Sequence, residues 1–292
     1  MSDKYPKINI GLIGIILLFI SITIYSFSSV SIFLSLIILC IGNCCLHVSG
    51  AECTLKNSNG KLSHSAIFVS GGSFGVITGK LLAKTFIKPW YLLFVILTMI
   101  PFVFLANTYD NTNKKANCKD FNYINNNINP ALIILFAVFV VIVRGYVGYG
   151  IPTSWNKTTI QTIIFFMTMG LGKALGGILS DRFGIRKIAI ISTLGSIPFL
   201  CFGDNIMLIS ILGVMMFSMT MSITLAILVS TLKKTPGLAF GLTTIGLFLG
   251  TAPIFFIKIT SKLRNISLII ISSIICCYIL MKVLRKGDTY DR

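Results

Sequence analysis

Long uninterrupted apolar runs limit what this chain can fold into more than any other feature. The runs are about 17–25 residues long, the length that an α-helix needs to cross the hydrocarbon core of a bilayer. Hydrophobic residues make up 55% of the 292 residues and charged residues only 11%, whereas a soluble domain carries about 25% charged residues. The short alternating segments of a transmembrane β-barrel are not seen in the sequence. The sequence therefore predicts an all-α polytopic membrane protein.

About ten transmembrane helices are expected from these runs. They cover Ile8–Phe27, Val30–His47, His64–Ala83, Lys88–Leu105, Ala131–Gly150, Thr159–Gly176, Lys187–Phe202, Ile206–Thr231, Gly237–Ile257 and Ile266–Met281. The one extended polar segment, Asn107–Pro130, is rich in Asn and is predicted to be a flexible cytoplasmic linker. The expected organisation is thus a four-helix bundle in residues 1–106, the linker in 107–130 and a six-helix bundle in 131–292.

The distribution of positive charge predicts the orientation in the membrane. The chain has 25 Lys and Arg against 8 acidic residues, a net charge of +17. Because the cations flank the apolar runs, the positive-inside rule explains the excess, and no nucleic-acid partner is expected. With Met1 in the cytoplasm, sixteen of the 25 cations fall on that side and six on the other, which are Lys84, Lys88, Lys157, Lys258, Lys262 and Arg264. We therefore expect a multi-pass plasma-membrane protein with both termini in the cytoplasm.

A short polar break between two apolar runs is the strongest local motif. It reads Gly177-Ile-Leu-Ser-Asp181-Arg182-Phe-Gly184-Ile-Arg186-Lys187. The chain begins with a similar pattern, Ser2-Asp3-Lys4-Tyr5-Pro6-Lys7, 178 positions earlier. Near the same offset, Gly60 precedes the third run as Gly237 precedes the ninth. Two similar halves are the usual construction of secondary transporters, so the first four runs are expected to correspond to the last four.

The break at Gly177–Lys187 resembles the cytoplasmic signature of the major facilitator superfamily, with Ile185 in a place where that family usually has Arg. The signature joins the second and third helices of each six-helix half. The resemblance therefore implies a truncated major-facilitator-type fold, in which the four-helix half lacks its first two helices. It also implies a secondary active transporter that moves a small solute through the lipid bilayer by alternating access.

Within that superfamily, the first part of the chain resembles exporters of the fosmidomycin-resistance type. The residues that carry this resemblance are Asp3-Lys4-Tyr5-Pro6, His47 with Glu52, and the glycine-rich run Phe68–Leu82. Efflux by an antiporter is therefore expected, with protons as a candidate coupling ion. Lys80 stands where a related exporter motif has Pro. The alternative is a non-transporting remnant, or one piece of a split transporter whose partner supplies the two helices.

The two copies of the signature are implied to form a conformational switch. The resemblance places Asp181 at the start of the third run, near Gly60–Ser65, and Asp3 at the start of the ninth, near Pro236–Leu238. A carboxylate at a helix N-terminus is stabilised by the helix dipole. The alternative is an ordinary positive-inside loop. The residues assigned to the switch are Gly177, Asp181, Arg182, Gly184, Arg186, Lys187, Asp3 and Lys4.

Arg144 is the cation that lies deepest within an apolar run. An intramembrane cation costs about 2.5–3.5 kcal/mol on insertion scales, so it needs a partner or a water-filled cavity. Arg144, together with Tyr146 and Tyr149, is a candidate for binding a polar or anionic group of the substrate. A structural pair or snorkelling is the alternative, and it is easier for Lys80 and Lys173, which lie near the ends of their runs.

His47 and Glu52 are the only close titratable pair and are candidates for proton coupling, because either group can titrate near neutral pH. A structural contact is the alternative for this pair.

Glycines in two runs are expected to pack helices closely in the small-xxx-small manner. They are Gly71, Gly72, Gly75 and Gly79 in one run, and Gly170, Gly172, Gly176 and Gly177 in the other. The cysteines lack zinc-finger spacing, and no catalytic motif such as HExxH or GxSxG is present. We therefore expect no metal, no cofactor and no enzymatic activity.

Overall fold

The computed structural model describes residues 3, 8–27, 32–85, 88, 90–112, 118–151, 153–256 and 262–285, and most of this part of the chain is helical. Its helices are α1 (Ile10–Phe27), α2 (Ile32–Lys56), α3 (Leu62–Lys84), α4 (Tyr91–Thr112), α5 (Pro130–Tyr149), α6 (Thr159–Phe183), α7 (Ile185–Ile190), α8 (Ser196–Phe202), α9 (Met207–Ser218), α10 (Thr220–Thr231), α11 (Pro236–Thr251) and α12 (Lys262–Val283). Three short helical turns accompany them: η1 (Cys118–Asp120), η2 (Ile191–Gly195) and η3 (Ala252–Phe255).

Seven helices in this part of the chain are long and apolar enough to cross a membrane. Two of the seven are compound, because α7, η2 and α8 form one helical stretch and α9 and α10 form another. The apolar parts of α1, α4 and α11 are shorter than those of these seven helices. The all-helical, multi-pass class is therefore supported, while the expectation of ten spans remains a prediction.

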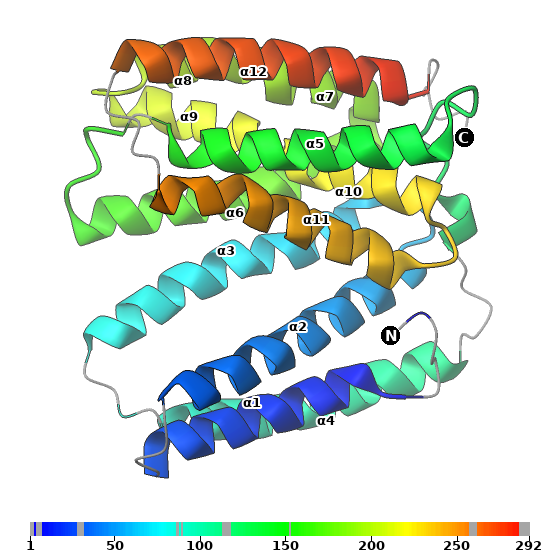
Figure 1. Ribbon diagram of the computed structural model, residues 1–292, viewed down its shortest axis with the longest axis vertical. Coiled ribbons are helices and arrows are strands. Elements are labelled where there is room, and N and C mark those ends of the chain that lie inside the picture. The colour runs from blue at the N-terminus through cyan, green and yellow to red at the C-terminus, as the bar shows by residue number, and fades with distance from the viewer. Residues whose placement is uncertain are drawn as a thin grey trace.

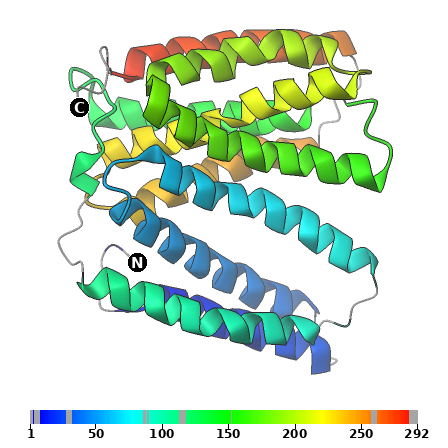
Figure 2. The ribbon, with the colours of Figure 1, turned by 180° about the vertical axis from the view of Figure 1, so that it is seen from behind.

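The helices form two groups that meet along α3 and α6 (Figures 1 and 2). We call α1–α4 the N-half and α5–α12 the C-half. Within the N-half, α1 packs against α2 and α4, and Ser21 on α1 exchanges hydrogen bonds with Ser35 on α2. In the C-half, α5 packs against α10, α11 and α12. The two halves contact each other mainly through α3 with α6 and α2 with α11.

Two of the expected C-half spans are interrupted. The stretch that begins at α7 contains the π-helical turn η2, and a break at Met219 separates α9 from α10. Hydroxyl groups bond back to carbonyls around the π-turn, for example Ser192 Oγ to Ala189 O at 3.0 Å and Ser196 Oγ to Ser192 O at 3.0 Å. Such side-chain bonds compete with the regular backbone ladder and bend helices.

Residues 118–130 differ from the flexible linker that composition predicts. Phe121 is completely buried, and the Tyr123 hydroxyl donates to the carbonyl of Gly60 at 2.7 Å. The backbone N–H of Asn125 donates to Val283 O at 2.8 Å, which ties the segment to the end of α12. The aromatic and aliphatic residues among the asparagines are buried in the core, and burying them offsets the entropy of ordering the segment.

The glycines of α3 and α6 also behave differently from each other. A Cβ atom at Gly177 would lie 2.8 Å from Leu62 O and closer still to the Cβ of Ala66, so this glycine lets α3 and α6 touch. A Cβ atom at Gly71, Gly72, Gly75 or Gly79 would meet nothing within 4 Å. The packing role predicted for those four residues is therefore wrong, because α3 meets α6 through the side of the helix that carries Ala66, Ser73 and Ile77.

Candidate functional site

Asp181, near the end of α6, caps the first turn of α3 in the other half. Its Oδ1 accepts the N–H of Leu62 at 2.8 Å, and its Oδ2 accepts the N–H of Ser63 at 2.9 Å. The first N–H groups of a helix have no partner within the helix, and Lys61 at the N-cap provides no side-chain bond. A carboxylate from the C-half therefore satisfies donors that α3 cannot satisfy itself.

Asp3 makes the reciprocal contact from the N-half to the C-half. Its two oxygens accept the N–H groups of Gly237 at 3.1 Å and Leu238 at 2.9 Å in the first turn of α11. Thr235, the N-cap residue of α11, gives no side-chain cap either. The structure places both aspartates at the helix starts that the resemblance implied, whereas Lys4 lies outside the described residues.

The remaining signature residues shape the turn after Asp181. Gly184 has φ +93°, a conformation that residues with a side chain rarely adopt, and it ends α6 and begins α7. Arg186 donates through Nη2 to the carbonyl of Met281 in the last turn of α12, at 3.4 Å. Arg182 and Lys187 are exposed, and the guanidinium of Arg182 lies 5.4 Å from the ring centroid of Phe183 beside it. Gly184 thus shapes the turn that follows Asp181, and Arg186 ties that turn to α12, while Arg182 and Lys187 form no ion pair among the described residues.

An apolar cluster closes the same end of the molecule. Ala51, Leu55 and Leu62 of the N-half are buried together with C-half residues such as Ile185 and Ile223. The carboxylate bridges, three of whose four hydrogen bonds are partly buried, therefore lie beside an apolar contact between the halves.

Arg144 lies inside the C-half. Its side chain is only 8% exposed, and its guanidinium stacks 3.6 Å from the ring centroid of Phe217. Nη2 donates to Phe217 O at 2.5 Å and to Ser192 O at 3.1 Å, so Arg144 joins the end of α9 to the π-turn. Nε and Nη1 have no hydrogen-bond partner among the residues that the structure describes. This geometry favours the structural alternative over substrate binding.

The two tyrosines predicted to accompany Arg144 do not support that substrate site. Tyr146 is half-buried, but a spacing of two residues places it on the other side of α5 from Arg144. Tyr149 belongs to α5, and its side chain lies outside the described residues.

Two intramembrane cations join the halves, which agrees with the structural alternative given for them from the sequence. Lys173 on α6 donates to Ser73 Oγ on α3 at 2.8 Å, and Lys80 Nζ on α3 lies 4.4 Å from the ring centroid of Phe166 on α6. No carboxylate in the described part of the chain forms an ion pair with either lysine. The sequence signal for this contact was a lysine in one apolar run and a serine in another. A single sequence does not give the register between the two helices, so the pairing could not be predicted.

His47 and Glu52 are not brought together. Five residues along α2 separate their side chains by about 140° around the helix. Glu52 is buried and pairs with Lys56 at 2.5 Å, while the exposed His47 ring meets Phe68 edge-on with centroids 6.3 Å apart. The proton-coupling pair therefore has no geometric support.

Asp204 is a buried carboxylate that sequence reasoning missed. It accepts the N–H of Ser154 at 3.0 Å and its hydroxyl at 2.7 Å, which joins the loop after α5 to the turn between α8 and α9. These loops lie at the end of the C-half opposite Asp181. The two loops belong to the C-half, so these hydrogen bonds of Asp204 stabilise that half.

Comparison with known proteins adds no assignment. No protein-family model matches the chain, and no curated protein has a significantly similar sequence.

Proposed function

We propose that this protein is a secondary active transporter that moves a small solute across the membrane by alternating access, with a construction like that of the major facilitator superfamily. The observation that carries the proposal is the reciprocal pair of carboxylate caps. Each half supplies one aspartate to the first turn of a helix in the other half, at the same end of the molecule. The direction of transport, efflux, rests on the resemblance of the N-half to exporters.

The caps suit a contact that forms and breaks during a transport cycle. A hydrogen bond to a charged group contributes about 1.5–3 kcal/mol net. Water can replace the carboxylate at the helix ends once the halves separate, which keeps the cost of opening moderate. In the proposed cycle, the caps hold the cytoplasmic end closed and release together when that end opens.

Hydrogen–deuterium exchange of the protein in lipid nanodiscs tests this coupling without a known solute. In Asp181→Asn, the amides of Leu62 and Ser63 lose a charged acceptor and should exchange faster. If the two caps form one switch, the amides of Gly237 and Leu238, which Asp181 does not touch, should also exchange faster. A rise confined to the start of α3 would contradict the switch.

Asp204→Asn is the matched control, because this carboxylate also accepts an N–H but joins loops within one half. Its exchange effect should stay near Ser154.

Transport itself is tested with a panel of labelled small solutes and inverted membrane vesicles, in which efflux appears as accumulation. Asp3→Asn and Asp181→Asn should both lower the accumulation rate of any solute that the native protein moves. Equal rates in native and variant vesicles would remove the carboxylates from the mechanism.

A further inference from the structure

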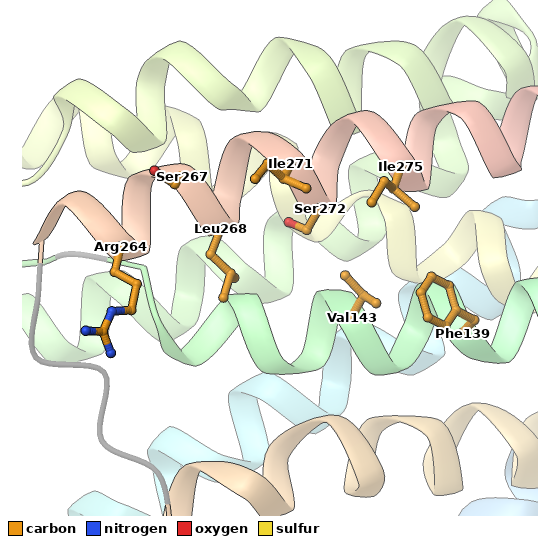
Figure 3. Close-up of a pocket in the computed structure, with 8 residues that line it drawn as sticks. All are labelled: Phe139, Val143, Arg264, Ser267, Leu268, Ile271, Ser272 and Ile275. Carbon is orange, nitrogen blue, oxygen red and sulfur yellow. The ribbon is translucent and has the colours of Figure 1, made fainter.

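An apolar groove runs between α5 and α12 on the outside of the C-half. Its volume is about 360 Å³, and it is lined by Phe139 and Val143 of α5 and by Leu268, Ile271 and Ile275 of α12. Arg264, in the first turn of α12, lies at one end, and Ile275 with Phe139 lies at the other (Figure 3). Phe139, Ile271 and Ile275 are exposed, so the groove opens outward from the helix bundle.

The length of the groove matches one leaflet of a bilayer. Eleven residues separate Arg264 from Ile275, which is about 17 Å along a helix, and one leaflet of hydrocarbon is about 15 Å thick. Arg264 lies at the end of α12 opposite the C-terminal turn that contacts Asn125. The apolar lining thus extends from the non-cytoplasmic interface towards the middle of the membrane.

The charge at the mouth of the groove forms no ion pair with any residue that the structure describes. Among the described residues, no carboxylate lies within ion-pair distance of the exposed Arg264. The sequence adds Lys258 and Lys262 close by, so half of the six cations expected on the non-cytoplasmic side precede or begin α12. The positive-inside rule predicts few cations there, and the cluster therefore calls for an anionic partner at the interface.

We propose that this groove is a binding site for an anionic phospholipid of the non-cytoplasmic leaflet. One acyl chain lies along Leu268, Ile271 and Ile275, and the phosphate is bound by the guanidinium of Arg264. A guanidinium matches the geometry of phosphate oxygens and binds them through two parallel hydrogen bonds. An apolar groove with a cation at the interface fits a lipid better than a soluble anion, which would leave the apolar lining uncovered.

The test measures lipid retention on the purified protein by native mass spectrometry after incubation with micelles containing equal amounts of phosphatidylglycerol and phosphatidylcholine. The native protein should retain phosphatidylglycerol preferentially. In Arg264→Gln the preference should fall about fivefold, the effect of one cation at an anionic interface. Arg264→Lys should keep most of it. Lys157→Gln is the control, because it removes an exposed cation from the same side without touching the groove.

A second variant tests the acyl-chain part of the site. Ser272→Phe places a large side chain in the groove and should lower retention of both lipids. Unchanged preference in Arg264→Gln, or unchanged retention in Ser272→Phe, would overturn the proposal. Equal loss of preference in Lys157→Gln would also overturn it, because the preference for phosphatidylglycerol would then come from the overall positive charge of that surface and not from the groove. Inorganic phosphate added in excess should not displace the lipid, and displacement would identify a soluble anion as the ligand.

Discussion

Arg144 illustrates how one residue type can serve two roles that only geometry separates. A substrate-binding arginine would point into a cavity, whereas Arg144 stacks on Phe217 and donates to two carbonyls at helix irregularities. We predict that Arg144→Lys lowers the free energy of unfolding by about 1–2 kcal/mol, because the shorter ammonium loses the planar stacking and the fork geometry. Denaturation in detergent measures this.

The same substitution at Arg264, whose side chain is exposed, provides the control for Arg144 and should leave stability within about 0.5 kcal/mol of the native value. If Arg144→Lys were as stable as the native protein but impaired in transport, substrate binding would become the better account of Arg144.

Cys118 gives a prediction about pH. Burial raises the pKa of its thiol from 9.0 to about 11. Between these values the native state holds a proton that the unfolded state has lost, so stability falls as the pH rises. The contribution is fully present below about pH 9 and is lost by about pH 11, with a magnitude of about 2–3 kcal/mol.

Unfolding free energies of the native protein and Cys118→Ala at pH 8 and pH 11 check this prediction. The variant should lose less stability over that interval, because it lacks the titrating thiol. Equal losses would show that Cys118 does not contribute to the alkaline transition.

At the scale of the helices, the closest approach between the halves depends on glycine. Gly177→Ala should push α6 away from α3, since its Cβ would meet Leu62 O and Ala66, and overpacking of this kind costs about 1–3 kcal/mol. Gly79→Ala is the matched control, because that position faces open space and alanine favours helix by about 0.5–1 kcal/mol.

Thermal unfolding in detergent should separate the two glycine variants in opposite directions. The amide exchange of Leu62 and Ser63 should also rise in Gly177→Ala alone, because the displaced helix carries Asp181. Equal stabilities of the two variants would contradict the close contact.

The helices themselves follow from the sequence, because each apolar run is long enough to require backbone hydrogen bonds within the run. Their ends follow less well. The helices α2 and α6 continue to Lys56 and Phe183, beyond the predicted ends, since the polar residues that follow the apolar runs still extend them. The break at Met219 has no glycine or proline to signal it, and it forms in the tertiary context that includes Arg144.

Only part of the candidate site was readable from the sequence. The repeat places two aspartates at equivalent points, and a resemblance to a known signature names the helices that they meet. The partners of Arg144 and Lys173 depend on the register and rotation of the helices relative to one another. The apolar pattern of a single membrane-spanning sequence does not determine that register or rotation. For the same reason, the sequence did not show that the four glycines of α3 face away from the neighbouring helices.

For the whole molecule, orientation decides what the two carboxylate caps control. The described contacts gather Asp3, Gly60, Tyr123 and Asp181 at one end, together with the last turn of α12. Sixteen of the 25 cations are assigned to that end, so the positive-inside rule predicts that it faces the cytoplasm. The switch is therefore expected to close the cytoplasmic side.

Single cysteines in a cysteine-free background test this orientation. Lys157→Cys, between α5 and α6, should react with a membrane-impermeant maleimide in intact cells, and Lys61→Cys, beside Asp181, should react only after permeabilisation. Both residues are exposed, so the barrier to labelling is the membrane and not burial. The reverse pattern would invert the molecule. The carboxylate caps would then close the outer side, and the groove with Arg264 would face the cytoplasmic leaflet, where anionic lipids are concentrated.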